Sequence, residues 1–206
     1  MPERTTPEGP IRFAVLASGS GTNFQALIDS ADPMVEFSLL ISDRAGAGAL
    51  RHGEAAEIPT AVVAYSEHPD REGFSIAIVE AARASGAEVL VLAGFMRVLS
   101  PVAVNAFPDR ILNIHPSLLP AFPGARAVAQ ALAYGAKVTG VTVHFVDEEV
   151  DHGPIIAQRP VPVLDDDTVE TLHERIQIEE HKLYPEVISA FARGRIEVVG
   201  REVVWR

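Results

Sequence analysis

A strand-like segment in the middle of the chain ends in an amide and an imidazole, which together suit acyl transfer. Residues 111–120 read ILNIHPSLLP. Because side chains along a strand alternate between its two faces, Asn113 and His115 project in the same direction. An amide can donate a hydrogen bond to a developing oxyanion, and an imidazole can move a proton. A lone histidine would more often be structural, but this pair before Pro-Ser-Leu-Leu-Pro indicates catalysis.

A carboxylate that could serve the imidazole lies later in the chain, in the turn Asp151-His-Gly-Pro. A carboxylate beside an imidazole raises the pKa of the ring and fixes its orientation. The spacing leaves open whether Asp151 reaches His115 or is an ordinary turn residue. For His144 and His152, which lie near this turn or in it, we expect structural or substrate-shaping roles.

A glycine-rich turn near the N-terminus could bind an anion. Residues 18–23 read SGSGTN and join an apolar run to a helical pattern. The backbone N–H groups of such a turn and the dipole of the following helix attract a phosphate. A dinucleotide fingerprint needs Gly or Ala three residues after Gly21, where this chain has Phe24, so a single phosphate fits better. The turn lacks the Gly-Lys-Ser/Thr of nucleoside-triphosphate loops, and a purely structural turn remains the alternative.

The elements that must position these residues alternate between strands and helices. Strands are expected at residues 11–18, 35–41, 60–64, 89–93 and 111–114, and helices at 23–30, 47–56, 72–84 and 125–134. This alternation predicts an α/β fold with a doubly wound, mostly parallel sheet, Rossmann-like in its mononucleotide-binding half. Such sheets bind ligands at the carboxyl ends of their strands, where Asn113 and His115 would lie.

The pattern changes near residue 137. Strand-like runs without an intervening helix occupy residues 137–146 and 155–163, and two short strands are expected at 196–199 and 202–205. These runs predict antiparallel strands added near the C-terminus. Between them, Asp167-Thr-Val-Glu170 has the spacing of a capping box with Asp167 as N-cap. In the helix that follows, Pro185 can introduce a kink and Gly194 would end it.

Composition limits the possible functions. The chain has 206 residues, a net charge of −11 and no basic run, so no nucleic-acid partner is expected. It has no cysteine, which excludes disulfides, thiol nucleophiles and cysteine-type zinc sites. Its most apolar stretch, residues 89–96, is too short to cross a bilayer, so no membrane partner is expected. Residues 1–10 read as a disordered tail without a signal peptide, which favours a cytoplasmic protein.

Five segments together resemble the phosphoribosylglycinamide formyltransferases, folate-dependent enzymes of purine biosynthesis. They are SGSGTN, VLAGFMRVLSP, LNIHPSLLPAFPG, TGVTVHFVDEEVDHGPI and QIEEHKLYP. The similarity extends from about residue 11 to residue 191. The Asn-x-His-Pro-Ser-Leu-Leu-Pro block is specific to the wider superfamily that uses formyltetrahydrofolate. The glycine turn and the late Gln-x-x-Glu indicate the glycinamide ribonucleotide branch.

The resemblance implies a reaction in which the amine of glycinamide ribonucleotide attacks the formyl carbon of 10-formyltetrahydrofolate, a co-substrate, without a metal. Asn113 would hydrogen-bond the oxygen of the tetrahedral intermediate, and His115 would supply or relay the proton to the leaving folate nitrogen. Asp151 would orient His115 and raise its pKa. The expected organisation is a single domain at residues 11–206, with a phosphate-binding half at 11–110 and a catalytic, folate-binding half at 111–206. The expected partners are small molecules and a second copy in a homodimer.

The resemblance also implies binding residues. The ribonucleotide would contact Gly21, Thr22, Asn23, Gln177 and Glu180, the last two lying on one helical face. The folate would contact Arg71, Met96, Arg97, Val98, Leu99, Asn113, Val146 and Asp151. For Met96 and Leu99 the alternative is burial in the core, as for any apolar residue there. Arg71 and Arg97 would also supply local positive charge for anionic ligands on an acidic protein.

One segment departs from the family pattern. After Phe-Pro-Gly many relatives have Gly-x-His, whereas this chain has Gly124-Ala-Arg126. The departure concerns a loop next to the active site and leaves the catalytic residues unchanged. A tight turn beside the catalytic strand further predicts a cis peptide bond between Leu119 and Pro120.

Two other interpretations remain open. One is another enzyme of the superfamily: a formyltetrahydrofolate hydrolase, a methionyl-tRNA formyltransferase or a sugar formyltransferase. The first usually carries an N-terminal regulatory domain and the second a basic C-terminal domain, which a chain of 206 residues with a net charge of −11 does not accommodate, and the third needs no such phosphate loop. The other is a non-catalytic nucleotide-binding module. Asn113, His115 and Asp151 argue against it, because binding alone does not require them together.

Overall fold

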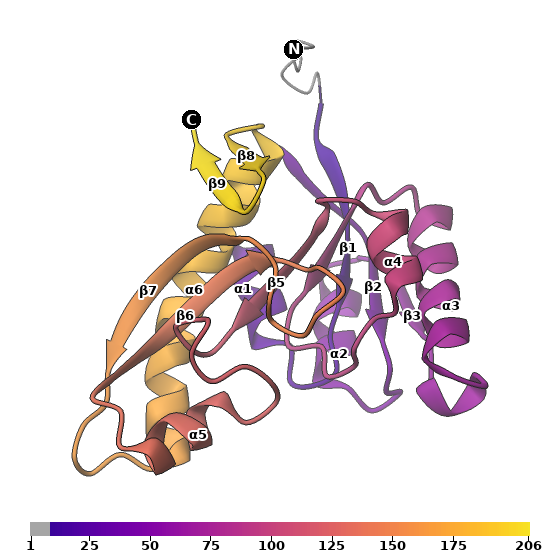
Figure 1. Cartoon of the computed structure of the whole chain (residues 1–206). Coiled ribbons are helices and arrows are strands. Elements are labelled where there is room, and N and C mark those ends of the chain that lie inside the picture. Colours follow the sequence, from indigo (N-terminus) through magenta and orange to yellow (C-terminus); the bar gives the residue numbers. More distant parts are fainter. Residues whose placement is uncertain (1–8) are drawn as a thin grey trace.

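A seven-stranded sheet forms the centre of residues 9–206, which are the residues that the computed structural model describes (Figure 1). Its strands lie in the order β3-β2-β1-β4-β5-β6-β7. They are β1 (Ile11–Leu16), β2 (Val35–Ser42), β3 (Thr60–Val62), β4 (Val89–Leu92), β5 (Ile111–His115), β6 (Val138–Phe145) and β7 (Ile155–Pro162). Of the tail expected at residues 1–10, residues 1–8 lie outside the described part of the chain.

Helices follow most of the strands. They are α1 (Thr22–Asp29), α2 (Gly48–Ala55), the 3₁₀ turn η1 (Tyr65–Glu67), α3 (Arg71–Ala84), α4 (Pro101–Ala106), α5 (Ala127–Tyr134) and α6 (Val169–Ala192). A separate hairpin, β8 (Ile196–Val199) and β9 (Glu202–Trp205), ends the chain. The strands β1 to β5 pair in parallel, whereas β5–β6 and β6–β7 are antiparallel. The prediction of a doubly wound sheet with antiparallel strands added late is confirmed.

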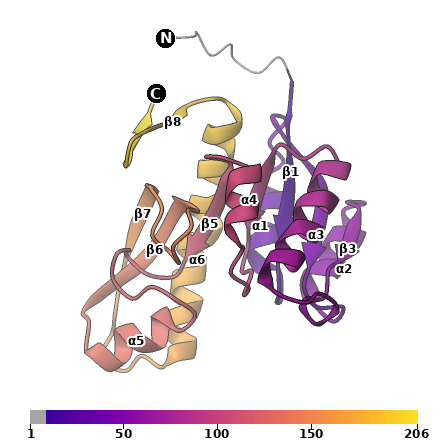
Figure 2. The ribbon, with the colours of Figure 1, turned by 45° about the vertical axis from the view of Figure 1, so that its right-hand side comes forward.

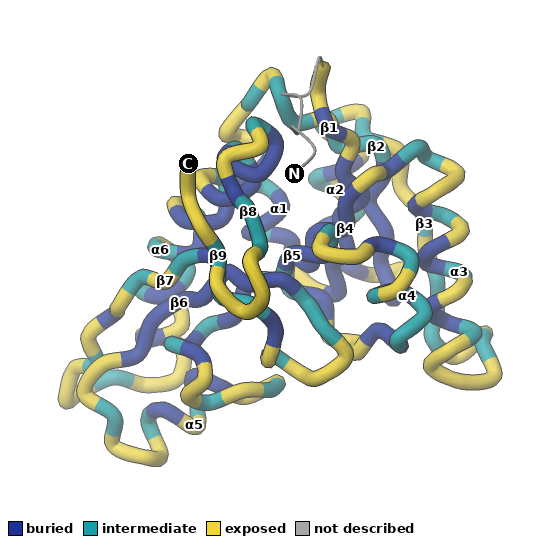
Figure 3. The backbone as a smooth tube through the Cα atoms, turned by 45° about the horizontal axis from the view of Figure 1, so that its top comes forward, coloured by how far each residue is buried: buried dark blue, intermediate teal, exposed yellow. Residues whose placement is uncertain are grey.

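The two faces of the sheet are covered by different helices because side chains alternate along each buried strand. In β1, Phe13 and Val15 join the core beneath α1, α2 and α6, while Ala14 and Leu16 join the core beneath α3 and α4. Figure 2 shows α6 and α3 on opposite sides of the parallel strands. The central strands are buried almost throughout, as the dark segments of Figure 3 show.

The strand order reverses between β1 and β4, which opens a crevice at their carboxyl ends. The glycine turn follows β1, and the segment of residues 93–99 follows β4. The two are joined directly: the backbone N–H of Ser18 donates to the carbonyl of Gly94 (3.2 Å), and the N–H of Met96 donates to Ser18 Oγ (2.9 Å). The predicted phosphate and folate regions are therefore neighbours.

Strand β6 extends the sheet beyond the part that α3 and α4 cover. Its Val141 and Val143 belong to the core beneath α6, and the opposite core includes no described residue of β6 or β7. In the antiparallel register Asn113 pairs with His144, so both side chains lie on the face that α3 and α4 leave open. This uncovered face at the end of β5 is where the site forms.

Two local predictions were incomplete or wrong. Helix α4 was not expected, because six residues are too few to show a helical period. Asp167 is not the N-cap of α6; Thr168 is, and it forms the capping box with Thr171. The carboxylate of Asp167 instead receives two hydrogen bonds from Arg175 (2.7 and 2.8 Å). This ion pair draws Asp167 out of the cap.

Two other backbone predictions, the cis peptide bond and the glycine that ends α6, are confirmed. The Leu119–Pro120 peptide bond is cis. Helix α6 ends at Ala192, and Gly194 follows with a φ of 68°. Pro185 lies inside α6, which continues on both sides of it.

A buried tyrosine fastens α6 to the sheet beside the site. The hydroxyl of Tyr184 lies 3.0 Å from the carbonyl of Leu92 and 3.1 Å from that of Leu112, on adjacent strands β4 and β5. Burial raises the pKa of Tyr184 well above its usual value, so the hydroxyl keeps its proton and acts as a donor. Helix α6, which carries Gln177 and Glu180, is thereby held at a fixed height over β5.

Replacing Tyr184 with Phe should lower the free energy of unfolding by about 1–2 kcal/mol, because buried carbonyls lose their donor. Urea denaturation measures this change. Tyr134→Phe is the matched control, since Tyr134 is 81% exposed and should tolerate the loss of its hydroxyl. Equal stability of the two variants would contradict the anchoring role.

Candidate active site

The structure brings Asn113, His115 and Asp151 together at the end of β5. Asp151 Oδ2 lies 3.3 Å from His115 Nδ1, and Asp151 Oδ1 accepts a hydrogen bond from Asn113 Nδ2 at 3.3 Å. The N–H of Gly124 also donates to Asp151 Oδ2 at 2.7 Å. One carboxylate therefore joins the strand tip to two loops that are distant in sequence.

The ring of His115 is buried and lies between two acceptors. Its Nε2 donates to the carbonyl of Phe122 (2.9 Å), while Nδ1 faces Asp151. Burial lowers the pKa of His115, and the charge of Asp151 and the Phe122 carbonyl offset part of that effect. A neutral ring of this kind can accept a proton at Nδ1, where the carboxylate stabilises it.

The carboxylate itself is ionised. Burial opposes the charge on Asp151, but the contacts with His144, His115 and the Gly124 N–H outweigh burial and hold its pKa below the usual range. The residue has a φ of 52°, an uncommon conformation outside glycine that Asp tolerates better than most residues. The turn that carries Asp151 is thus bent to aim the carboxylate at the ring.

A second histidine belongs to this group. His144 Nδ1 donates to the carbonyl of Phe145 (2.7 Å), so its Nε2 accepts a hydrogen bond from Asn113 Nδ2 at 3.1 Å. His144 Nε2 also lies 3.7 Å from Asp151 Oδ1. Both N–H bonds of the Asn113 amide are therefore directed, one to His144 and the other to Asp151.

A cleft opens in front of these residues. The segment after β4 forms one wall, the loop after β6 forms the other, and Asn113, His115 and His144 lie at its base. The predicted folate residues that line it are Met96, Arg97, Val98, Leu99, Asn113, Val146 and Asp151. Arg71 is at the first turn of α3 and is not among the described residues that line the cleft.

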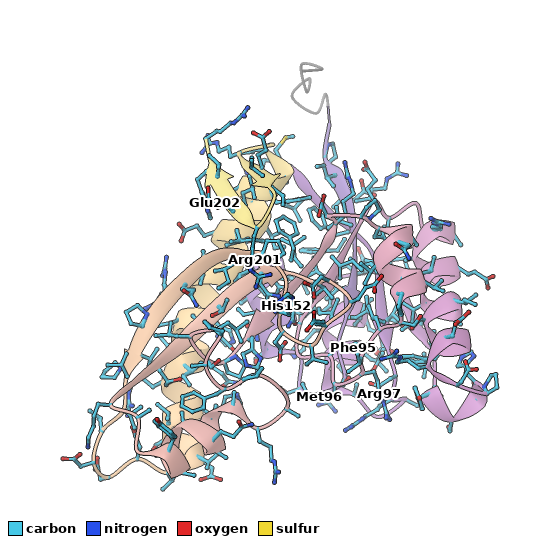
Figure 4. The ribbon with its side chains drawn as sticks, in the orientation of Figure 1. Phe95, Met96, Arg97, His152, Arg201 and Glu202 are labelled. Carbon is cyan, nitrogen blue, oxygen red and sulfur yellow. The ribbon has the colours of Figure 1, made fainter. Side chains whose placement is uncertain are left out.

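The apolar residues of the first wall differ in burial. Met96 and Val98 are 58% and 44% exposed, whereas Leu99 is buried in the core. Figure 4 shows Met96 and Arg97 projecting from the segment after β4. Burial in the core, the alternative to a binding role, therefore holds for Leu99. Met96 and Val98 instead present apolar surface to a ligand in the cleft.

The predicted ribonucleotide residues also meet. Asn23 Nδ2 donates to Glu180 Oε2 at 2.9 Å in the protein interior, and Gln177 Nε2 lies 3.5 Å from Thr22 Oγ1. Gly21 precedes α1 with a φ of 85°, and a Cβ there would lie 2.5 Å from the Cα of Ala49. Only glycine allows this turn and its close contact with α2.

Comparisons with known proteins decide the family. The formyl transferase model matches residues 11–188. The phosphoribosylglycinamide formyltransferase of Mycobacterium tuberculosis is 46% identical over 97% of this chain and 94% of its own. The crystal structure of glycinamide ribonucleotide transformylase 1 from Symbiobacterium toebii superposes with a TM-score of 0.94 at 48% identity, covering 97% of this chain and 95% of its own. The chain belongs to the phosphoribosylglycinamide formyltransferase family.

Within this family member, Arg97 is not a free cation. Its Nε donates to Asp43 Oδ2 at 2.9 Å, and its guanidinium lies 4.7 Å from the ring centroid of Tyr65. The Asp43 side chain is fully buried and offsets positive charge from both Arg97 and Arg44, whose Nε lies 3.8 Å from the same oxygen. Arg97 therefore braces the cleft wall against the end of β2, which the expectation of local positive charge did not foresee.

The sequence analysis did not foresee that His144 contacts Asn113 and Asp151. The signal that could have found it is the antiparallel register: once the run at residues 137–146 pairs with β5, His144 lies opposite Asn113. Within residues 9–206, no group of three or more His, Cys, Asp or Glu side chains could hold a metal ion. No helix in the same range is both long and apolar enough to cross a bilayer.

Glu180→Gln should stabilise this formyltransferase at neutral pH when no substrate is present. Burial raises the pKa of Glu180, so its protonated form is favoured in the folded protein. That contribution to stability is fully present below the pKa of the unfolded chain and is lost as pH rises through the folded pKa. The amide keeps an acceptor for Asn23 and carries no charge, so the gain of the variant should grow as pH rises.

Urea midpoints measured between about pH 4 and pH 8 test this expectation. Glu179→Gln is the matched control on the adjacent residue. Its pKa is lowered, chiefly by Lys182, so the control should change stability in the opposite direction. A gain that is independent of pH would contradict a buried ionisable Glu180.

Proposed function

We propose that this protein transfers the formyl group of 10-formyltetrahydrofolate to the amine of 5-phosphoribosylglycinamide. The products are formylglycinamide ribonucleotide and tetrahydrofolate, and the reaction belongs to purine biosynthesis. The observation that carries the proposal is the contact of Asn113, His115 and Asp151 with one another at the base of the cleft. The relatives that are named for this reaction cover nearly the whole chain.

The folate would lie in the cleft. Exposed Met96 and Val98 suit a flat aromatic ring, and the loop after β6 offers backbone groups and carboxylates to its polar edge. Arg71, which is exposed beyond the cleft, would reach the anionic glutamate tail of the folate. This arrangement directs the formyl group towards the base of the cleft.

The ribonucleotide would lie between the glycine turn and α6. Backbone N–H groups at Gly21, Thr22 and Asn23 would bind its phosphate at the start of α1. Gln177 and Glu180 would hold its ribose and glycinamide end. In this arrangement each substrate would contact both halves of the chain, residues 11–110 and 111–206. The boundary would therefore not separate a phosphate-binding half from a folate-binding half.

Attack of the amine on the formyl carbon makes a tetrahedral intermediate with a negative oxygen. Asn113 would donate to this oxygen with one of the N–H bonds that it directs to His144 and Asp151. The attacking nitrogen loses a proton, and the folate nitrogen gains one as its bond to carbon breaks. His115 would relay that proton, with Asp151 stabilising the charged ring at Nδ1.

Two further features belong to the proposal. We infer that the protein acts in the cytoplasm, as expected for a chain without cysteine, and as a homodimer. Light scattering at two protein concentrations measures its mass in solution, and a monomer at both would contradict the dimer.

His115→Ala and Asn113→Ala should each lower kcat by at least about a hundredfold, with both KM values within about threefold of wild type. The assay follows the absorbance of tetrahydrofolate formed in the presence of glycinamide ribonucleotide. Asn105→Ala is a matched control, since Asn105 is an exposed amide on α4. Near wild-type turnover by His115→Ala would refute the mechanism, and product formed without the ribonucleotide would indicate a hydrolase.

The dependence of kcat on pH tests whether the charge of Asp151 acts on the pKa of His115. A lowered pKa of His115 places the acid limb of the kcat profile below that of an ordinary histidine. Asp151→Asn removes the charge that raises this pKa, so the limb should move to still lower pH while kcat falls. A limb that moves to higher pH would show that Asp151 does not act on His115.

A further inference from the structure

The C-terminal hairpin has no role in the site described so far. Strands β8 and β9 form a sheet of their own, and the matching family model ends at residue 188, before the hairpin begins. The hairpin is nevertheless fixed to the body of the protein: Ile196 is buried, and Val198 and Val203 pack against the core beneath α6. Strand β9 also packs against β7.

The first link from the hairpin reaches a bulge in β7. Val143 pairs with Ala157 and His144 with Ile155, so Ile156 is an extra residue opposite the step from Val143 to His144. Its carbonyl accepts a hydrogen bond from Trp205 Nε1 at 2.9 Å. Bulges redirect neighbouring side chains, and this one lies beside the residue that contacts both Asn113 and Asp151.

The second link reaches the loop that carries the carboxylate. Arg201 Nη2 donates to the carbonyl of His152 at 2.6 Å, and His152 directly follows Asp151. Figure 4 shows Arg201 beside the loop that carries His152. Within the loop, His152 Nδ1 lies 2.7 Å from Asp147 Oδ2. The loop is therefore held from within by its own hydrogen bond and from outside by the hairpin.

The two links enclose a short segment. The carbonyl of His152 is bound just before β7 begins, and the carbonyl of Ile156 is bound just after. Asp151 directly precedes His152, and His144 pairs with Ile155, the neighbour of Ile156. A donor fixed on a packed hairpin limits how far each carbonyl can move. Asp151 has a φ of 52°, so its turn needs support from its neighbours to keep the carboxylate aimed at His115.

We propose that Arg201 and Trp205 are positioning residues of the active site, which hold the loop after β6 so that Asp151 and His144 meet Asn113. Neither residue lines the cleft among the described residues, so both act through the backbone of His152 and Ile156. The inference rests on the proposed formyl transfer. It predicts that the hairpin affects the folate side of the reaction and leaves the ribonucleotide side unchanged.

The test compares Arg201→Gln, Trp205→Phe and Arg201→Lys with the control Arg206→Gln in the full-length protein. Arg206 lies on the same hairpin, but its guanidinium pairs with Glu197 inside it. Arg201→Gln and Trp205→Phe should raise the KM for 10-formyltetrahydrofolate about threefold to tenfold and lower kcat, with the KM for the ribonucleotide unchanged. Arg201→Lys keeps a charged donor on a long side chain, whereas Gln has a shorter, neutral one, so Arg201→Lys should recover part of the loss, and Arg206→Gln should match wild type.

A pH profile separates positioning from a general loss of structure. When Arg201 no longer holds the loop, Asp151 should support the charge of His115 less well. The acid limb of kcat should then move in the same direction as in Asp151→Asn, while the melting temperature stays close to that of Arg206→Gln. A loss of structure alone would lower the melting temperature and affect both substrates without moving the limb.

Several outcomes would overturn the proposal. These are wild-type constants in Arg201→Gln and Trp205→Phe, equal changes in the KM of both substrates, or an unshifted acid limb. Failure of the proposed function is distinct from these results, because the unmodified protein would then form no tetrahydrofolate with the ribonucleotide present.

Discussion

The carboxylate of Asp151 is the interaction on which the site depends. Its two oxygens meet an amide from β5, an imidazole from the same strand and a backbone N–H from the loop before α5. Strand β5 supplies two of these groups, the loop before α5 supplies the third, and the loop after β6 supplies the carboxylate, so no single element builds the site. Because the carboxylate is largely buried and ionised, removing one partner leaves a charge without compensation, and the remaining geometry changes with it.

The sheet explains why the two substrates can meet. The reversal of strand order between β1 and β4 places the glycine turn beside the segment that forms one wall of the cleft. The hydrogen bond from Met96 to Ser18 then ties the wall to the turn. Antiparallel β6 contributes the other wall, since its loop returns over the end of β5. A purely parallel sheet would have required a helix at the place where the cleft opens.

How much the sequence predicted follows from the range of the interactions. Apolar runs and glycine turns are local signals. They sufficed to predict a doubly wound, mostly parallel sheet and the shared face of Asn113 and His115. Local signals could not predict the contact of Asp151 with His115, because it depends on a turn with positive φ. The pairing of Arg97 with Asp43 joins residues 54 apart in sequence, and no local pattern announces it. Asp167 was misplaced for a similar reason, since Arg175 competes for its carboxylate.

An acidic chain that binds anionic substrates must make its positive potential locally. The positive charge of Arg97 is partly offset by buried Asp43, which Arg44 also faces at 3.8 Å. The glycine turn can supply positive potential, because N–H groups at a helix start attract anions without adding net charge. Glu180 lies next to that turn, and burial favours its neutral form, which reduces repulsion with a phosphate. Backbone dipoles, together with a carboxyl whose pKa burial raises, would therefore allow an anion site in a protein with a net charge of −11.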